Sequence, residues 1–375
     1  MRPRSQIDPA ALVDGVRSLP GLDEMRHAAA GRPAYLVGGA VRDLLLGLPV
    51  ADIDVAVSGD AAAVARALGS AATVHDRFGT ATVRIADGHA VDLAATRRET
   101  YPAPGALPVV EPAGIDEDLA RRDFTINAMA VPLEAPDQLL DPFGGLGDLA
   151  AGTLRLLHGS SVADDPTRTL RGSRYAARLD LEPAPDTEAQ LRGTDLTTVS
   201  DDRRREELRR VAAESRPGAC LALLATWGVL KLGADIPAIA NSVAELASTP
   251  PWGELANPFE AVVAVAEGRM GAAPALAAER PESPSAAARL TAGRSGTELL
   301  LARALGAHWP QEWAERWRLV SLEIDGDDLL RAGVPEGPAI GRGLQAALEA
   351  KLDGSVQGRE AELRTALEAA GNPAR

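Results

Sequence analysis

The chain has 375 residues, of which 46% are apolar, so it can bury more than one hydrophobic core and is expected to hold two or three domains. Its 39 basic side chains are outnumbered by 53 acidic ones, and the net charge of −14 argues against a general affinity for polyanions. No apolar run reaches the ~20 residues that span a bilayer, so we expect a cytoplasmic protein without a membrane partner. The single cysteine, Cys220, excludes an intramolecular disulfide and a zinc cluster built from cysteines.

Hydrophobic periodicity predicts short strands alternating with helices in the first third of the chain. Strands are expected over 34–37, 53–57, 81–85 and 90–95, with a helix over 61–68 between them. From residue 116 the pattern turns helical, with arginine-rich helices expected over 167–179 and 203–213. The sequence therefore predicts an α+β chain, in which a mixed-sheet head precedes an all-α remainder.

Three proline-rich segments are expected to be irregular. The first, 97–114, contains four prolines and two glycines and is predicted to be a mobile loop beside the head. The others, 237–258 and 271–287, are predicted to be boundaries or long loops within the helical part.

A Gly-Gly pair stands between the first predicted strand and a helix, in the segment Tyr35-Leu-Val-Gly-Gly-Ala-Val-Arg-Asp43. Glycines at such a place let a phosphate approach the backbone, and a helix N-terminus favours negative charge. Gly38 and Gly39 are also compatible with plain turn geometry, so the interpretation depends on their neighbours.

Two aspartates, Asp52 and Asp54, stand at the start of the second predicted strand. Residues two apart in a strand point to the same face, so the two carboxylates share one location. Like charges this close repel unless a proton or cation lies between them, and a pair of oxygen ligands suits Mg²⁺. A solvated strand face is the alternative, which the preceding Gly-Gly-x-x-Arg turn makes less favoured.

The motifs together resemble a known family. Gly38-Gly-Ala-Val-Arg-Asp43 followed by Asp52-Ile-Asp54 is similar to the head signature of polymerase-β-type nucleotidyltransferases. Arg121-Arg-Asp-Phe-Thr-Ile-Asn-Ala128 and Asp141-Pro-Phe-Gly-Gly145 narrow the resemblance to the bacterial branch that contains tRNA nucleotidyltransferases, or CCA-adding enzymes, and poly(A) polymerases. The resemblance extends over roughly residues 35–207 and more faintly to the end.

The resemblance implies roles for the second motif. Arg122 would contact the phosphates of the nucleotide together with Gly38, Gly39 and Arg42, while Asp123 would contact the ribose and Asn127 belongs to the same motif. Taken alone, an Arg-Arg-Asp cluster before an apolar stretch equally indicates charge at a helix C-terminus and a structural ion pair.

A third motif, Asp164-Asp-Pro-Thr-Arg168, stands where the family has its base-reading motif. On a helix Asp165 and Arg168 would share a face, with the carboxylate accepting from the amine of cytosine or adenine and the guanidinium donating to the ring. Asp164 replaces the family's usual Glu and is expected to orient Arg168 or cap the helix. The resemblance also implies that Arg171 and Arg174 contact the nucleotide. For Arg203 and Glu207 it implies a structural ion pair that braces the neck helices.

The resemblance implies template-independent addition of CCA to the 3′ end of tRNA, with CTP and ATP as donors and Mg²⁺ held by Asp52 and Asp54 as the catalytic residues. Pyrophosphate would leave, and no protein partner is expected. The expected domains are a head over 1–150, a neck over 151–215, a body over 216–300 and a tRNA-binding tail over 301–375. The segment 326–341 resembles a tail segment of the family, and either a phosphate-binding helical hairpin or a plain connection would fit it.

Alternatives remain at this stage. The chain could add only A or only C-C to tRNA, could polymerise A, or could be a silent tRNA-binding relative. In the family the switch from C to A depends on a loop such as 97–114, which argues against a C-C-only enzyme, and no basic extension typical of the poly(A) polymerases is present. Whether Asp92 is a third carboxylate at the metal site is left open.

Overall fold

The computed structural model describes residues 9–68, 72–75, 79–84 and 90–371. The chain divides into two compact units, the first holding residues up to 207 together with 222–231, and the second holding the remainder. The finer division into head, neck, body and tail stays a prediction. Within the described residues, no helix combines the length and the apolar character needed to cross a membrane.

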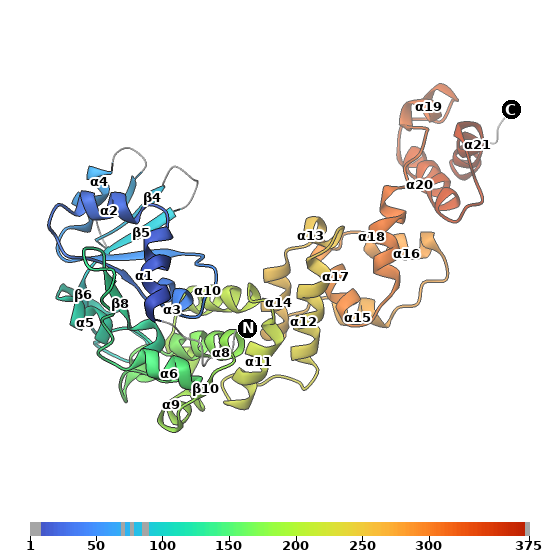
Figure 1. The fold of residues 1–375 in the computed structure, drawn as a ribbon. Helices are drawn as coiled ribbons and strands as arrows, with labels where there is room; N and C mark the ends of the chain where they lie inside the picture. The colour runs from blue at the N-terminus through green and yellow to red at the C-terminus, as the bar shows by residue number, and fades with distance from the viewer. Residues whose placement is uncertain (1–8, 69–71, 76–78, 85–89, 372–375) are drawn as a thin grey trace. The chain divides into compact units, whose positions relative to one another are not determined.

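The first unit is built around a six-stranded sheet with the order β3-β4-β5-β2-β1-β8 (Figure 1). Strands β2 and β5 run parallel, and the other neighbouring pairs run antiparallel. The strands are β1 (Ala34–Val37), β2 (Ile53–Val57), β3 (Ala72–His75), β4 (Thr80–Arg84), β5 (Ala90–Ala95) and β8 (Ala130–Pro132). The predicted strands are confirmed, with the one over 81–85 beginning one residue earlier and its residue 85 lying outside the described residues. The short strands β3 and β8 were not predicted.

Helices cover both faces of this sheet. The helices that accompany it are α1 (Pro9–Ser18), α2 (Leu22–Ala29), α3 (Gly39–Leu45), α4 (Ala61–Ala67) and α5 (Ile115–Ala120). Helix α3 packs against β1 and β2, and α4 packs against β3, β4 and β5. On the face that carries Val37 and Ala56, the buried Leu119 of α5 completes a separate apolar cluster. By strand alternation Asp54 lies on this second face, because it is two residues from Ala56.

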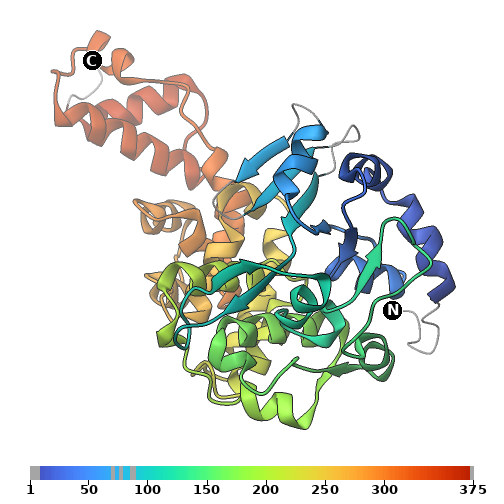
Figure 2. The ribbon, with the colours of Figure 1, turned by 90° about the vertical axis from the view of Figure 1, so that its left-hand side faces the viewer.

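The prediction of an irregular loop over 97–114 is wrong. Strands β6 (Arg97–Thr100) and β7 (Val109–Pro112) form an antiparallel hairpin, drawn in teal in Figure 2. The prolines do not prevent it, because three of them lie in the connection and Pro112 is the last residue of its strand, where a missing N–H is tolerated. The connection is tied down at Gly105, whose N–H donates to the Asp164 carbonyl and whose carbonyl accepts from Arg203 Nη1 at 3.0 Å.

The rest of the first unit is mainly helical, as predicted. Its elements are the 3₁₀ turn η3 (Thr125–Asn127), α6 (Gly145–Ala151), α7 (Ser161–Asp164), α8 (Thr167–Leu179), α9 (Pro185–Leu191), the 3₁₀ turn η4 (Leu196–Thr198), α10 (Asp201–Ala212) and α11 (Pro217–Thr226), of which α10 and α11 continue into the second unit. One exception to an all-α remainder is the parallel pair of β9 (Thr153–Leu154) and β10 (Glu182–Pro183).

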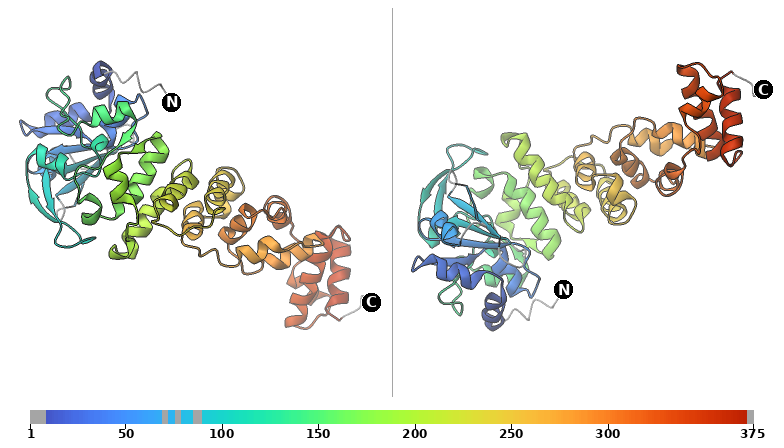
Figure 3. Two further views of the ribbon diagram at one scale, coloured as in Figure 1. Left: turned by 90° about the horizontal axis from the view of Figure 1, so that it is seen from below. Right: turned by 90° about the horizontal axis from the view of Figure 1, so that it is seen from above.

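The second unit consists of helices in its described residues (Figure 3, yellow to red). They are α12 (Ile236–Ala247), α13 (Trp252–Leu255), α14 (Pro258–Ala266), α15 (Ala273–Ala278), α16 (Pro284–Thr291), α17 (Gly296–Ala304), α18 (Trp309–Glu315), the 3₁₀ turn η5 (Trp317–Leu319), α19 (Gly326–Arg331), α20 (Pro338–Leu352) and α21 (Arg359–Ala369). The long loops predicted over 237–258 and 271–287 are therefore wrong. Several of their prolines occupy the first turn of a helix, where the missing N–H costs no hydrogen bond.

The last three helices share one small core. Leu329 of α19, Ala347 of α20 and Ala366 of α21 are buried together, so the segment 326–341 is a helix, a turn and the start of a second helix. This is the helical connection that the sequence suggested, and its predicted phosphate binding stays a prediction.

The motif Asp141-Pro-Phe-Gly-Gly145 fixes the position of α6. Asp141 accepts hydrogen bonds from the N–H groups of Gly145 and Leu146 at 2.7 and 3.0 Å, which satisfies the free donors of the first helical turn. A Cβ atom on Gly145 would stand only 2.2 Å from the Thr125 carbonyl oxygen, so the backbone of α6 directly abuts η3. Only glycine permits this approach.

We expect Gly145→Ala to destabilise the protein by about 2–3 kcal/mol, because the added methyl group forces α6 away from η3. The matched control is Gly147→Ala in the same helix, where an added Cβ would meet nothing within 4 Å. Urea unfolding of both variants measures the difference. Equal stabilities would contradict the close contact between α6 and η3.

Candidate active site

The Gly-Gly turn lies between β1 and α3, as predicted. Gly38 has a φ of 69°, a conformation that side chains rarely adopt, and its N–H donates to the Met129 carbonyl. A Cβ on Gly38 would stand 2.7 Å from Arg122 Nη1, and one on Gly39 would stand 3.5 Å from Arg42 Nη2. Gly38 therefore makes room for the Arg122 guanidinium directly against the backbone, whereas a side chain at Gly39 would only be in ordinary contact with Arg42.

Carboxylates of two neighbouring strands meet at the metal site that the sequence predicts. Asp54 of β2 is paired in register with Asp92 of β5, and Thr82 of β4 donates a hydrogen bond to Asp92 Oδ1 at 2.6 Å. Burial raises the pKa of Asp54, Arg122 opposes this rise, and the charges of Asp92 and Asp52 add to it. Asp54 is thus electrostatically coupled to both other aspartates, and a role for Asp92 as a third carboxylate at the metal site stays a hypothesis.

This donor set fits a hard divalent cation. Carboxylate oxygens are the ligands that Mg²⁺ prefers. Burial, the main cause of the raised pKa of Asp54, disfavours its ionised form, and a bound cation would stabilise that form. In the part of the chain that the structure describes, three or more acidic, histidine or cysteine side chains are nowhere gathered into a formed metal site. The two or three carboxylates are thus a partial ligand set that other oxygen donors would complete.

Arg122 connects the end of α5 to the Gly-Gly turn. Its Nη2 pairs with Asp118 Oδ2 at 3.0 Å, and Arg121 pairs with Asp118 Oδ1 at 2.9 Å, so the structural ion pair at the helix C-terminus is real. The Arg122 guanidinium also lies against Gly38, and its charge opposes the rise in the pKa of Asp54. The structure is therefore compatible with both a structural ion pair and a phosphate contact for Arg122.

The buried carboxylate of Asp123 is the centre of a hydrogen-bond network. Its oxygens accept from the Phe124 N–H at 2.8 Å, from Asn127 Nδ2 at 3.0 Å and from Arg171 Nε at 2.7 Å. Asn127 Oδ1 in turn accepts from Arg42 Nη1 at 2.6 Å. Burial opposes ionisation, but Arg171 and these hydrogen bonds outweigh it and lower the pKa of Asp123 to about 2. Four of the predicted site residues thus belong to one network.

The arginine stripe of α8 is anchored by an acid from α10. Glu207 stands 3.8 Å from Arg171 and 3.6 Å from Arg174, and its exposed fraction is 7%. Arg203, one turn earlier on α10, pairs instead with Asp165 at 3.0 Å. Both α10 residues therefore form ion pairs that hold α10 to the region of the nucleotide-binding motifs.

The base-reading motif differs from its prediction in one respect. Asp165 lies before α8, and its Oδ1 caps the Thr167 N–H at 3.0 Å, so Asp165 and Arg168 do not share a helix. The reason is Pro166, which cannot donate a hydrogen bond and stands at the point where α8 begins. Arg168 is buried and donates from Nη2 to the Arg121 carbonyl at 2.8 Å. Asp164 accepts from Ser160 rather than orienting Arg168.

Two atoms of this motif remain available to a base. Arg168 Nη1 is buried without a hydrogen-bond partner among the described residues. Asp165 uses Oδ1 for its contacts with Thr167 and Arg203. A free donor on one residue and a second carboxylate oxygen on the other are the groups that an amino-pyrimidine or adenine edge would need.

Sequence reasoning missed the hairpin residues beside this motif. Tyr101 donates to Glu99 Oε2 at 3.1 Å, and Glu99 pairs with Arg121 at 2.9 Å. Burial and the charge of Glu99 raise the pKa of Tyr101 to about 12, with smaller electrostatic effects from Arg168 and Asp165. The hairpin could not be associated with the motif from sequence, since the segment was expected to be an irregular loop.

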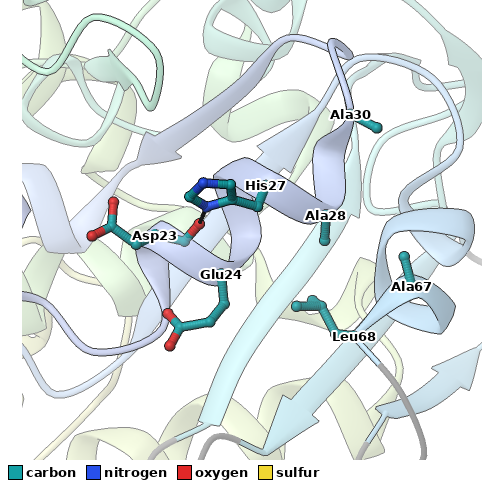
Figure 4. A pocket seen from close by; sticks show the side chains of 7 residues that line it. All are labelled: Asp23, Glu24, His27, Ala28, Ala30, Ala67 and Leu68. Carbon is teal, nitrogen blue, oxygen red and sulfur yellow. Dashed lines mark hydrogen bonds between the residues drawn. The ribbon is translucent and has the colours of Figure 1, made fainter.

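A surface pocket between α2 and α4 lies apart from these residues (Figure 4). Its lining includes Ala67, Leu68 and His27, whose Nδ1 donates to the Asp23 carbonyl at 2.6 Å. None of the predicted site residues lines it.

Comparisons with known proteins found a matching family model and similar proteins. Residues 34–155 match the family described as the poly A polymerase head domain. A CC-adding tRNA nucleotidyltransferase from Deinococcus radiodurans is 36% identical over 363 residues, which cover 92% of this chain and 92% of that protein. An A-adding tRNA nucleotidyltransferase from Halalkalibacterium halodurans is 42% identical over 195 residues, or 49% of this chain and 46% of that protein.

Solved structures are similar over nearly the whole chain. The Thermotoga maritima CCA-adding enzyme complexed with tRNA is 28% identical with a TM-score of 0.75, covering 96% of this chain and 98% of that chain. A CCA-adding enzyme in complex with ATP is also 28% identical, with a TM-score of 0.78 and coverage of 96% and 97%.

The lowered pKa of Asp123 makes the stability of the protein depend on pH. A carboxyl group whose pKa is lower in the folded state stabilises that state fully above its unfolded pKa, and the contribution disappears as the pH falls through the folded value. We therefore expect the wild-type protein to have a larger free energy of unfolding than Asp123→Asn at neutral pH. This difference should shrink by about 2 kcal/mol as the pH falls from roughly 5 toward 2.

Urea unfolding at several pH values measures this difference. The control is Asp137→Asn, a change at an exposed aspartate, which should follow wild type at every pH. A difference between wild type and Asp123→Asn that does not change with pH would contradict the ionised, buried state of Asp123.

Proposed function

The chain belongs to the family of tRNA nucleotidyltransferases, and we propose that it adds C, C and A in turn to the 3′ end of tRNA, using CTP and ATP without a nucleic-acid template. The observation that carries this proposal is the position of Arg122, which lies against Gly38 and acts electrostatically on Asp54. This position supports a site in which phosphate-binding groups and metal-binding carboxylates would act together. A reaction that uses tRNA, CTP and ATP would take place in the cytoplasm.

The triphosphate would bind at the Gly-Gly turn. Arg42, Arg122 and Arg171 provide positive charge there, and the glycines allow the phosphates to reach the backbone at the start of α3. Asp123 would contact the ribose, as the resemblance to the family implies. Asn127, in the same motif, and Asp123 position Arg42 and Arg171 through direct hydrogen bonds. Binding in this orientation would leave the α-phosphate facing the carboxylates of β2.

Asp52 and Asp54 would hold Mg²⁺, with Asp92 as a neighbouring third acid. When bound, the ion would lower the pKa of the tRNA 3′-hydroxyl and offset charge on the phosphates. The 3′-oxygen would attack the α-phosphorus in line, forming the new phosphodiester bond as the bond to pyrophosphate breaks. The arginines of the site would stabilise the negative charge that gathers on the departing pyrophosphate.

Asp165 and Arg168 would select the base. The carboxylate would accept from the exocyclic amine of cytosine or adenine, and Arg168 Nη1 would donate to the adjacent ring nitrogen. Uracil and guanine present a carbonyl where the carboxylate needs a donor, so they would be rejected. Arg174 would support this side of the site through its ion pair with Glu207.

The helical second unit would hold the tRNA. The chain carries a net charge of −14, so the contacts must be local, and the body over 216–300 and the tail over 301–375 are the proposed elements. The turn before α20 in the tail would then be one place for a phosphate contact, as its resemblance to the family suggests.

Addition of C-C alone is the second candidate, because a CC-adding enzyme matches 92% of the chain. The hairpin of β6 and β7 supports the complete reaction, since the resemblance to the family links the switch from C to A with a loop at this place. The two candidates differ in the last nucleotide only.

We expect purified protein with Mg²⁺, CTP and ATP to convert a tRNA transcript ending at the discriminator base into one ending in CCA. Transcripts ending at C and at C-C test each step separately, and sequencing of the products identifies the added nucleotides. Arrest at C-C would replace the proposal with the second candidate, whereas no incorporation on any transcript would contradict both.

The inactive variant for this assay is Asp54→Asn, which removes a charge from the metal ligands. Incorporation should fall by at least about a thousand-fold while tRNA binding, measured by filter retention, stays near wild type. Asp137→Asn should keep full activity. An active Asp54→Asn variant would show that the metal assignment is wrong.

We expect Arg168→Ala to weaken the discrimination between CTP and UTP by about ten-fold or more, because the donor to the cytosine ring is lost. The kcat/KM ratio for the two nucleotides measures this effect. Arg192→Ala, a change on the exposed end of α9, is the matched loss of an arginine and should leave the ratio unchanged. Unchanged selectivity in Arg168→Ala would mean that other residues read the base.

A further inference from the structure

Three guanidinium groups surround the ring of Tyr175 in α8. The Cζ atoms of Arg42, Arg171 and Arg178 stand 5.3, 5.9 and 5.6 Å from the centre of the ring. These distances lie within the ~6 Å at which the negative face of an aromatic ring attracts a cation. Three arginines in one place would repel one another, and the neutral aromatic ring offsets this repulsion by attracting each of them.

Two of these arginines are the proposed triphosphate ligands, and each is also held by hydrogen bonds to polar side chains. Arg42 donates to Asp43 and Asn127. Arg171 donates from Nε to Asp123 at 2.7 Å, and its Nη2 forms an ion pair with the same carboxylate oxygen. These bonds lie in the plane of each guanidinium, whereas the ring restrains it from another direction. Removal of the ring would leave the edges bonded but the planes free to tilt.

The ring is itself held in position. Phe124 meets it edge to face, with the ring centres 5.7 Å apart and the planes at 83°, and Phe124 is fully buried. The hydroxyl oxygen of Tyr175 accepts a hydrogen bond from Arg171 Nη2 at 3.2 Å. Only 8% of Tyr175 is exposed, so the ring cannot leave this position without disturbing the packing of the first unit.

We propose that Tyr175 is a positioning residue for nucleotide binding, whose ring holds the guanidinium groups of Arg42 and Arg171 in the orientation that the triphosphate requires. The proposal rests on the proposed function, because it assigns those two arginines to the phosphates. Tyr175 touches no substrate in this role. It acts before binding, since arginines that are already oriented lose less conformational freedom when the anion arrives.

The test compares Tyr175→Leu with Tyr175→Phe. Without the ring, the KM for CTP and for ATP should rise by about ten-fold, while the KM for tRNA should stay within about two-fold of wild type. Tyr175→Phe keeps the ring and should recover most of the nucleotide affinity. Leu191→Ala, which removes buried side-chain volume in α9, controls for a general loss of stability.

The result that overturns the proposal is defined by these comparisons. If Tyr175→Leu raises the nucleotide KM no more than Leu191→Ala, or if Tyr175→Phe is as impaired as Tyr175→Leu, the ring has no positioning role. If Tyr175→Leu raises the KM for tRNA equally, the defect is a general one and the proposal is also wrong.

Arg42→Ala separates this proposal from the proposed nucleotide site. An unchanged KM for CTP in Arg42→Ala would contradict the nucleotide site itself. If Arg42→Ala raises the KM for CTP but Tyr175→Leu does not, only the proposed role of Tyr175 is overturned. In the double variant, Tyr175→Leu should add clearly less than its single effect, because the ring acts through the arginine, and full additivity would contradict this.

Discussion

The buried carboxylate of Asp123 connects the sheet-bearing part of the first unit with helix α8. Through Arg171 it reaches α8, and through Asn127 and Arg42 it reaches α3 and the Gly-Gly turn. A carboxylate at this depth is stable only because each of these partners supplies a donor, and its pKa of about 2 reflects that support. Arg171 and Arg42, which we propose to bind the phosphates, are consequently positioned by the Asp123 carboxylate, Arg171 directly and Arg42 through Asn127.

The same pairing explains how an acidic protein can present a site for a triphosphate. Three arginines of the proposed site are each accompanied by an acid: Arg122 by Asp118, Arg171 by Asp123, and Arg174 by Glu207. The pairs fix the guanidinium groups and limit their mutual repulsion, so little free positive charge is left to attract polyanions at other places. Selectivity for a nucleotide then depends on geometry more than on net charge.

Features that depend on residues close together in the sequence could be predicted, whereas contacts between distant segments could not. Strands β1, β2 and β5 were predicted at their observed bounds because alternating burial is a local signal. The neighbourhood of Asp54 and Asp92 needed the parallel pairing of β2 with β5, which is not local, and so Asp92 could only be left open. Tyr175 was missed for the same reason, since its three arginines come from two elements far apart in the sequence.

The errors at the prolines have a different physical cause. Proline has no backbone N–H to donate. It is nevertheless tolerated at the end of a strand, as at Pro112, and in the first turn of a helix such as α12. At Pro166 the same property separates Asp165 from α8, and the carboxylate becomes a cap instead of a member of the helix. Arg203 then bonds both Asp165 and the Gly105 carbonyl in the hairpin connection, so the base-reading acid and the hairpin share one guanidinium. A movement of either one must change the hydrogen bonds of the other.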